Sequence, residues 1–466
     1  MGVFINVFQN ADEKKSFPLS SWSDGTYNVS SAERYAIWNL VWHRVSYGDQ
    51  YPQPVDPAGT PRTDLLATLA LLPLPKAPVP TRCTNVYPLQ HQLQRYMPLV
   101  KHRPRLYLAL DVKDYADGLP LVLAQLIRLS RLLTPEGLAS EESRKATHLF
   151  TSPFKHPNNL DGTNIFISVY ESDSTDDTAR IAMSWYTALS ILGIPCRVVV
   201  NGVSRSGIPN RIEFLAEVRN RVLDPLVELW RQGDEFDRVV ILNDVVFCAE
   251  DILELIFQSM QQDSSITCGL DYFETGFYDI WVARDIDGQE FRKQPWDAFV
   301  PTPESASRLS RGLPFQAQCC FNGVAVYVAK PLATRQVQFR RSEKGTECAA
   351  SECSLICNDL AREGYGRVLV VPRVRFAYDT RTYGKVWNMT KVLWDITSLT
   401  SSWSTFVPFN QERIRSWKDG PTSVLCKGLE GNGHEPDTDG IWQKLEYRHS
   451  VYREEMRLGD YLVSLV

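Results

Sequence analysis

Short apolar runs alternate with longer amphipathic segments through the middle of the chain, and this alternation restricts the fold more than any other feature. The run "RLYLALDV" (Arg105–Val112) is typical of a buried strand, and Leu119–Leu133 after it has apolar residues at helical spacing. Further strands are expected at Asn164–Tyr170, Cys196–Val200 and Asp237–Leu242. Strands that alternate with helices predict an α/β fold, in which helices cover both faces of a mostly parallel sheet.

The helices that accompany the later strands are predicted from capping residues and apolar spacing. They run from Asp177 or Thr178 to about Leu192, from about Arg211 to Trp230, and from Ala249 to Met260. The next part of the chain is expected to form short strands and loops that carry Asp, Tyr, Trp and Arg together. We therefore expect one α/β domain, the catalytic domain, at 105–380.

Two flanking regions complete the predicted organisation. Residues 1–104 are rich in proline and aromatic residues, and are expected to form a stem or wrapping segment with a helical patch near Ala32–Val45. Residues 381–466 are expected to form an irregular tail that packs on the core.

Composition is that of a soluble globular protein, with 44% apolar and 23% charged residues among 466. The net charge of −5 announces no polyanion-binding surface, so nucleic acid is excluded as an expected partner. No apolar run approaches the roughly 18–20 residues that a membrane helix needs. Neither a transmembrane segment nor a signal peptide is therefore expected in this sequence.

The ten cysteines leave the cellular compartment open, because none is spaced as a paired C-x-x-C metal knuckle. Cys353 and Cys357 lie four residues apart, and buried packing on one face of a helix is the expected role of both. Sequons at Asn28 and Asn388 permit a luminal address without requiring one.

Acidic and polar residues follow two of the predicted strands directly. "ESDSTDDT" begins at Glu171 after the second strand, and Asn243 and Asp244 follow the fourth. In parallel sheets the carboxyl ends of the strands form the ligand-binding edge, so these groups are expected to lie close together. Each acid alone is more often a helix cap or a turn former.

Three further elements follow in order and could serve the same edge. The helix "AEVRNRVLDPL" presents Arg219, the loop "CCFNGVAV" contains Gly323, and the helix "SECSLICNDL" opens with Glu352. A solvated arginine, a turn dipeptide and a dipole-stabilised first-turn acid are the ordinary alternatives. Together, however, the elements match what transfer from a nucleotide sugar requires: base contacts, an acid for a metal, cations for the diphosphate, and a close backbone approach.

Four of these motifs resemble those of GT-A glycosyltransferases. "YESDSTDDT" is similar to their D-D-G-S-x-D-x-T turn, "EVRNR" to their A-R-N helix start, "LNDV" to the D-x-D motif and "SECSLICNDL" to the x-E-D helix. More narrowly, the segments between Leu106 and Asp379 resemble the fungal cryptococcal mannosyltransferase and capsule-associated family, glycosyltransferase family 69.

This resemblance implies a GT-A fold and an α-1,3-mannosyltransferase that retains the anomeric configuration. It implies GDP-mannose as the donor, and a glycan acceptor in fungal cell-wall or capsule polysaccharide synthesis. It also implies the Golgi or another secretory-pathway membrane, reached through a segment absent from this chain. In a direct retaining reaction the departing phosphate can take the acceptor's proton, so the site mainly positions groups and stabilises charge.

The resemblance also implies roles for individual residues. The metal ligand is Asp244, and the catalytic residues are Glu352 and Asp271. The residues expected to bind the nucleotide-sugar donor are Tyr170, Glu171, Asp173, Arg219, Asn220, Asn243 and Gly323. The residues expected to bind the acceptor are Asp279, Trp281 and Arg284, although acids and aromatics in a loop are also often ordinary packed residues.

The metal motif departs from the family pattern. Asn243-Asp244-Val245 offers one carboxylate, so affinity for Mn²⁺ or Mg²⁺ is expected to be weakened unless Glu250, Asp251, Glu352 or water completes the shell. No histidine follows the last core strand, where Asp379 either substitutes for it or forms a turn.

Two other functions stay open at this stage. A non-catalytic polysaccharide-binding or export scaffold on the same fold would explain Asn243 and Val245. A nucleotidyltransferase would need a glycine-rich basic loop after the first strand, and "ALDVKDYADGLP" supplies none.

Overall fold

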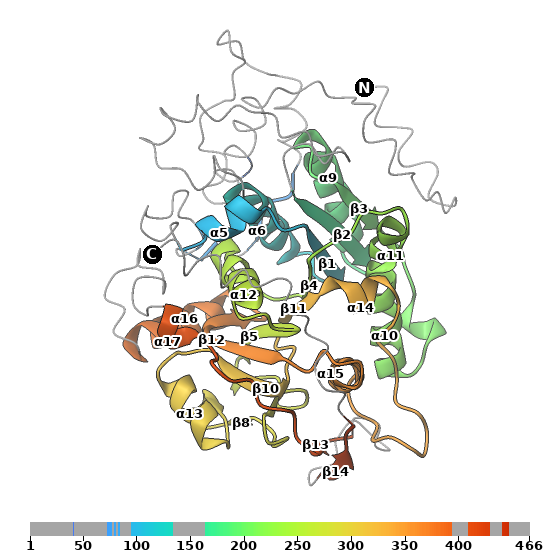
Figure 1. The fold of residues 1–466 in the computed structure, drawn as a ribbon. Helices are drawn as coiled ribbons and strands as arrows, with labels where there is room; N and C mark the ends of the chain where they lie inside the picture. The colour runs from blue at the N-terminus through green and yellow to red at the C-terminus, as the bar shows by residue number, and fades with distance from the viewer. Residues whose placement is uncertain are drawn as a thin grey trace, which may run out of the picture.

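A computed structural model of the chain describes residues 95–133, 164–393, 409–428 and 440–446, with a few single positions and a short stretch between 41 and 83. Its centre is a ten-stranded sheet in the order β3-β2-β1-β4-β11-β5-β12-β10-β7, with β6 paired to β5 (Figure 1). The strands of this sheet are β1 (Leu106–Val112), β2 (Ile165–Glu171), β3 (Cys196–Val199), β4 (Arg238–Leu242), β5 (Ile266–Phe273), β6 (Gly276–Phe277), β7 (Arg284–Asp285), β10 (Phe315–Cys319), β11 (Val324–Val328) and β12 (Val368–Ala377). Two small hairpins are β8 (Arg292–Lys293) with β9 (Ala298–Phe299), and β13 (Ser423–Cys426) with β14 (Ile441–Lys444).

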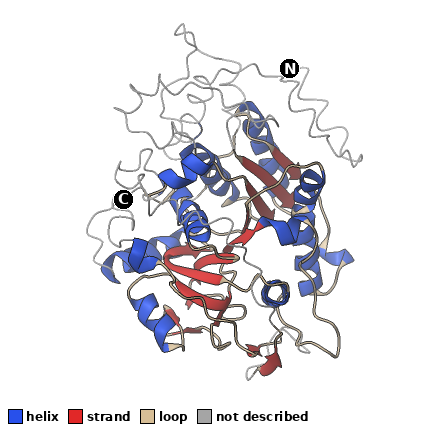
Figure 2. Cartoon of the chain, viewed as in Figure 1, coloured by secondary structure: helices blue, strands red, loops and turns tan. Residues whose placement is uncertain are grey.

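Helices lie on both sides of the sheet (Figure 2). They are α5 (Met97–His102), α6 (Leu119–Leu132), α9 (Thr178–Ile191), α10 (Arg211–Val222), α11 (Asp224–Arg231), α12 (Ala249–Gln261), α13 (Pro303–Ser310), α14 (Ala329–Ala333), α15 (Glu352–Arg362), α16 (Thr380–Leu393) and α17 (Phe409–Glu412).

Most strands of the sheet run in one direction. β1, β2, β3 and β4 pair in parallel, as do β5 and β12, while β11 runs antiparallel between β4 and β5. With β7, seven of the ten strands share a direction, and β6, β10 and β11 oppose them. The predicted α/β class with a mostly parallel sheet is therefore confirmed. The carboxyl ends of β1, β2, β4, β5 and β12 lie at the same edge as the beginning of β11.

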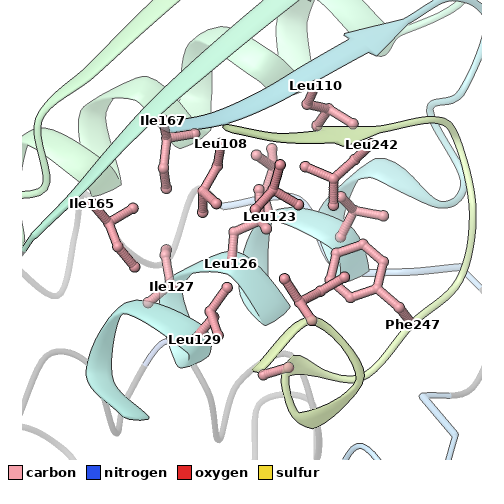
Figure 3. Close-up of a cluster of buried hydrophobic side chains, with 14 of the residues drawn as sticks. Leu108, Leu110, Leu123, Leu126, Ile127, Leu129, Ile165, Ile167, Leu242 and Phe247 are labelled. Atoms are coloured by element: carbon pink, nitrogen blue, oxygen red, sulfur yellow. The ribbon is translucent and has the colours of Figure 1, made fainter. Parts of the chain in front are cut away.

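Alternating side chains of β1 divide the core into two layers, because successive residues of a strand point to opposite faces. Leu106, Leu108 and Leu110 pack with residues of α6, α9 and α12. Tyr107 and Ala109 pack on the other face with residues of α10 and α11. Figure 3 shows the first layer, in which leucines of α6 meet leucine and isoleucine side chains of β1 and β2.

The structure agrees with the predicted strands and helices of the first half to within about two residues, with one exception. The helix expected over Arg211–Trp230 is two helices, because α10 ends at Val222 and Pro225 lies in the first turn of α11. The helical patch expected near Ala32–Val45 lies outside the described residues, apart from the buried helical residue Val41.

The tail is less irregular than predicted, because α16 follows β12 directly. Tyr383 and Val386 of this helix are buried, but Gly384 and the interspersed polar residues hide the apolar spacing in the sequence. Asp379 caps the helix by accepting 2.7 Å hydrogen bonds from the amide and the hydroxyl of Thr382.

A buried ionic cluster attaches a later segment of the tail to the core. Arg95 donates to Glu254 at 2.7 Å and to Glu412 at 2.6 Å, and the side chains of all three are at least nine-tenths buried. Gln258 of α12 donates to Glu412 at 3.0 Å. Because unpaired buried charges are costly, this cluster fixes α17 against α12.

Four disulfides connect the described elements: Cys83–Cys248, Cys268–Cys320, Cys319–Cys357 and Cys348–Cys426. The expectation that Cys353 and Cys357 both only fill the core is therefore wrong for Cys357. Cys353 is a buried free thiol, as is Cys196. Among the described residues, none of the helices combines the length and apolarity needed to cross a bilayer.

The Cys348–Cys426 disulfide gives a testable stability prediction, because it joins the β13 strand to the segment before α15 across 78 residues. Replacing both cysteines with serine should lower the free energy of unfolding by about 4 kcal/mol, from the loop entropy restored to the unfolded chain. Denaturant unfolding under non-reducing conditions measures the loss. Cys196→Ala, which removes a buried thiol without breaking a cross-link, is the control and should cost far less; equal losses would contradict the assignment.

Candidate active site

Polar residues from five elements gather where the parallel strands end. Asn243 and Asp244 follow β4, and the Asn243 amide donates to the Gly323 carbonyl at 2.9 Å, at the beginning of β11. The Val246 amide donates to the Ala377 carbonyl at 2.7 Å, which holds the loop after β4 against the end of β12. These backbone contacts bring together the loop after β4, the segment before β11 and the end of β12.

Arg219 is the most constrained cation of this edge. Its side chain on α10 is buried, forms an ion pair with Glu352 and donates to the Asn243 amide oxygen at 2.9 Å. The guanidinium also lies 4.8 Å from the centre of the Phe321 ring. Arg219 therefore joins α10, α15 and the end of β4 in one buried network.

Both carboxylate oxygens of Glu352 are occupied in this network. One accepts from Arg219, and the other accepts from the Ser351 hydroxyl at 3.1 Å. Ser351 is also the N-cap of α15, whose helix therefore begins at the ion pair. Glu352 lies close to the strand ends, as predicted, and its catalytic role stays a prediction.

Asn243 has a structural reason to be an amide. Its side-chain oxygen accepts a hydrogen bond from Arg219, whose positive charge is already paired with Glu352. A second carboxylate here would compete for the same guanidinium. Where the D-x-D pattern has an acid, Asn243 therefore serves as a neutral hydrogen-bond acceptor for Arg219.

Asp111, which the sequence analysis did not single out, is the acid that lies beside Asp244. It is the last residue but one of β1, and its neighbour Leu110 pairs with Leu242 at the end of β4. Burial raises the pKa of Asp111, the positive charge of Arg219 partly offsets this, and the negative charge of Asp244 raises the pKa again. One carboxylate oxygen of Asp111 is buried and has no hydrogen-bond partner within the described part of the chain. The sequence feature that could have indicated Asp111 is an acid inside an otherwise apolar strand.

Asp271 and Asp279 form a second pair of buried carboxylates. Asp271 accepts from the Asp279 amide at 3.2 Å and from the Tyr378 hydroxyl at 3.1 Å. Burial raises the pKa of both groups, and the charge of Asp279 raises that of Asp271 further. Two such groups in one site disfavour double ionisation, so a proton is retained at pH values where an exposed aspartate has lost it.

Gly323 allows the strands that carry these acids to approach closely. Its φ of +78° lies in the left-handed region, and a Cβ there would come within 2.9 Å of Val245 and 3.4 Å of Asp271. The preceding Asn322 donates its amide to Asp279 at 2.9 Å. Glycine is therefore required by the close contact between the ends of β4, β5 and β11.

The acids of the "ESDSTDDT" turn are used mainly by the backbone. Glu171 is fully buried and accepts from the amides of Ser174 at 2.5 Å and Asn201 at 2.7 Å. The Tyr170 hydroxyl accepts from the Val203 amide at 2.9 Å, and Asp173 is exposed. Their contacts with a nucleoside stay predictions.

The loops after β1 and β2 line an open hollow of about 620 Å³. Asp114 accepts from the Thr175 amide at 2.7 Å, and Asp176 accepts from the Ala116 amide at 3.0 Å, so the two loops hold each other. Tyr115 lines the hollow, and the charge of Asp244 contributes to the raised pKa of its hydroxyl. Because Asp114 and Tyr115 follow Asp111 by three and four residues, the hollow begins close to the end of β1.

Three other predicted ligands have protein partners. Asn220 makes two hydrogen bonds with the backbone of Phe339, at 2.8 and 3.1 Å. Arg284 is buried and donates to three backbone carbonyls, and burial lowers its pKa to about 10. The Trp281 ring lies 5.7 Å from the Lys427 ammonium. Their roles in binding donor or acceptor stay predictions.

The other residues considered for a metal shell are engaged elsewhere. Glu250 pairs with Arg128, and Asp251 accepts from the Tyr383 hydroxyl at 2.7 Å. Asp379 forms the cap of α16 described above. Within the described ranges, no group of three or more His, Cys, Asp or Glu residues is arranged to hold a metal.

Comparison with known proteins assigns the family. Residues 106–359, more than half of the chain, match the family model described as Cryptococcal mannosyltransferase 1. The chain belongs to this family. The match covers Asp111, Asp244 and Asp271 and ends before β12.

One relative is the alpha-1,3-mannosyltransferase CMT1 of Cryptococcus neoformans var. neoformans, 35% identical over 317 residues. The match covers 62% of this chain and 61% of that protein.

Solved structures similar to the chain include a mannosyltransferase from Pyrobaculum calidifontis in complex with GDP-Man and Mn²⁺. It is 13% identical with a TM-score of 0.31, over 80% of this chain and 71% of the other. A second is S. aureus TarS, 12% identical with a TM-score of 0.30, over 62% and 65%. The family assignment rests on the sequence matches alone.

The raised pKa of Asp271 predicts a stability change with a defined pH dependence. A folded-state pKa above the unfolded value means that stability is fully present below the unfolded pKa and is lost as pH rises through the folded one. Asp271→Asn, which resembles the protonated form, should therefore raise the free energy of unfolding at pH 7 to 8, by about 1.4 kcal/mol per unit of pKa shift removed.

This gain should shrink towards pH 4, as measured by denaturant unfolding across the pH range. Asp419→Asn, at an exposed position, is the control and should show no such trend. A destabilisation by Asp271→Asn that is independent of pH would contradict the assigned buried, proton-retaining pair.

Proposed function

We propose that the protein is a retaining α-1,3-mannosyltransferase that moves mannose from GDP-mannose to a glycan acceptor. The observation that carries the proposal is the meeting of Asp111, Asp244 and the Arg219–Glu352 pair at the strand ends of a chain from a mannosyltransferase family. The 35% identity to an alpha-1,3-mannosyltransferase supports the linkage. A fungal cell-wall or capsule polysaccharide is the acceptor class that fits this relative.

A divalent metal, Mn²⁺ or Mg²⁺, fits the Asp111–Asp244 pair. The unpartnered buried oxygen of Asp111 beside a second carboxylate is the donor set that hard cations take, completed by water and phosphate oxygens. A metal bound there would neutralise charge on the departing diphosphate. Asp111 would thus supply the carboxylate that Asn243 does not.

The donor's nucleoside is proposed to lie over the hollow after β1 and β2, next to this pair. Tyr115 lines the hollow and is within electrostatic range of Asp244, so nucleoside and diphosphate sites would be adjacent. Arg219 is already committed to Glu352 and Asn243, so its contribution is positive potential and a fixed position for Asp244. Glu352 would act by keeping that guanidinium in place.

The acceptor hydroxyl is proposed to approach from the side of Asp271 and Asp279. A carboxyl group that retains its proton can both donate and accept hydrogen bonds to sugar hydroxyls, and Tyr378 fixes the orientation of Asp271. In a direct retaining reaction the departing phosphate oxygen takes the acceptor proton. The protein's residues then bind, orient and exclude water, and no strong base is needed.

The four disulfides support folding in an oxidising compartment, as expected for an enzyme of the secretory pathway. Golgi residence and membrane association belong to the same proposal.

Turnover with a panel of nucleotide sugars tests the function. GDP-mannose should release GDP and transfer mannose to an oligomannoside, while Asp244→Ala should lower kcat/KM by at least about 100-fold through lost charge stabilisation. Asp419→Ala, an exposed acid, is the control and should retain full activity.

The alternative of a non-catalytic polysaccharide scaffold is favoured by one observation, the replacement of an acid by Asn243. Sugar binding without turnover of any donor, unaffected by Asp244→Ala, would establish the scaffold and end the enzyme proposal.

The metal assignment has a separate test that does not depend on activity. Isothermal titration of Mn²⁺ in the presence of GDP should show one site, weakened at least about ten-fold by either Asp111→Asn or Asp244→Asn. Glu250→Gln, which removes an acid already paired with Arg128, should leave the affinity within two-fold. Equal affinity in all variants would exclude this pair as the metal site.

A further inference from the structure

Three aromatic side chains form a partly exposed cluster beside the Asp271–Asp279 pair. We call Phe273, Tyr278 and Tyr378 the aromatic platform. Phe273 ends β5 and is 41% exposed, Tyr278 follows β6 and is 42% exposed, and Tyr378 follows β12. Their ring centres are separated by 4.8 Å for Tyr278 and Tyr378, and by 6.1 and 6.3 Å for the pairs with Phe273.

The platform is fixed in place by the strand ends that form the candidate site. The Tyr278 amide donates to the Asp271 carbonyl at 3.0 Å, and the Tyr378 amide donates to the Tyr272 carbonyl at 3.2 Å. The Tyr378 hydroxyl donates to the Asp271 carboxylate at 3.1 Å. The two tyrosines of the platform are therefore hydrogen-bonded to the strand end that carries Asp271.

The aromatic platform also lies within electrostatic range of the acids of the candidate site. The pKa of the Tyr278 hydroxyl is raised by burial, is lowered by the charge of Arg211, and is raised further by Asp271, Asp279 and Asp244. Tyr278 thus lies within range of both carboxylate pairs and of an exposed arginine at the first turn of α10. A ligand that covers the rings would therefore lie within the electrostatic field of these acids.

Exposed aromatic rings next to buried hydrogen-bonding groups suit a ligand with one apolar face and a polar rim. Two rings about two-fifths exposed leave apolar area in water that a ligand would bury. A pyranose ring has axial C–H groups on one face and hydroxyls around its edge, which matches this combination. A purely apolar partner would offer no hydrogen bond to the Tyr378 hydroxyl, which lies at the edge of these rings and donates to Asp271.

We propose that the aromatic platform is an acceptor subsite, on which a hexopyranose of the glycan acceptor stacks while its hydroxyls face the Tyr378 hydroxyl that Asp271 holds. This inference rests on the proposed function and specifies where the acceptor binds. The platform selects acceptors that present an unsubstituted C–H face, and it orients the reacting hydroxyl towards Asp244. Phe273 and Tyr278 supply stacking area, while Tyr378 positions Asp271.

Direct binding tests this assignment without requiring turnover. The probe is linear mannotetraose, added to the full chain in the presence of GDP and Mn²⁺ and followed by saturation-transfer difference NMR. Tyr278→Ala and Phe273→Ala should each raise its Kd about three- to ten-fold, while Tyr278→Phe should stay near the unmodified value. Phe299→Ala, at a similarly exposed ring (38%) on β9 outside the platform, is the control and should bind normally.

Kinetics then distinguish this inference from the proposed function. If GDP-mannose turns over, the platform variants should raise KM for the oligomannoside with little change in KM for the donor. Absence of any turnover would contradict the proposed function. The mannotetraose affinities would still show whether the aromatic platform binds sugar.

Two results would overturn the platform assignment. One is unchanged mannotetraose affinity in both alanine variants, provided that circular dichroism shows them folded. The other is a change in oligomeric state on Tyr278→Ala, which would show instead that the platform contacts a second copy of the chain.

Discussion

The buried guanidinium of Arg219 is the interaction on which the arrangement of the site depends. It ties α10 to the first residue of α15 through Glu352, and both to the end of β4 through Asn243. An arginine this deeply buried needs its partners, because loss of Glu352 would leave its charge uncompensated and loss of Asn243 would leave a guanidinium N–H without an acceptor. Since Asn243 precedes Asp244, the same network fixes the position of the proposed metal ligand. Structure and function are therefore constrained by one set of contacts.

The sheet topology supplies the rest of the site at this edge. Parallel strands bring Asp111, Asp244 and Asp271 to the same end, and Gly323 directly precedes antiparallel β11 there. The two carboxylate pairs have separate environments, one beside the loops after β1 and β2 and the other under the aromatic platform. This division matches a transferase that must hold donor and acceptor side by side. Burial of unpaired or coupled acids costs stability, which is typical of functional sites.

Strong periodicity made the core predictable from the sequence. The strand Arg105–Val112 and the helix near Leu119–Leu133 were expected almost as observed, and their alternation predicted the shared edge. The weaker pattern around Gly384 concealed α16, and Pro225 divided a helix expected to be continuous. Disulfide pairing could not be predicted, because connectivity depends on which elements become neighbours in space.

Site residues were harder to predict, because a sequence does not show what already occupies a polar group. Glu171 and Arg284 look like ligand contacts in the sequence, yet backbone amides and carbonyls use their side chains. Asp111 was missed for the opposite reason, since an acid in an apolar strand gains meaning only when Asp244 is seen beside it.

Anomalous scattering from a crystal of the protein grown with GDP and Mn²⁺ tests the central claim most directly. We expect one manganese peak within coordination distance of the carboxylates of Asp111 and Asp244, with the diphosphate beside it. An ordered manganese–GDP complex bound elsewhere on the molecule, with these two carboxylates free of both, would contradict it.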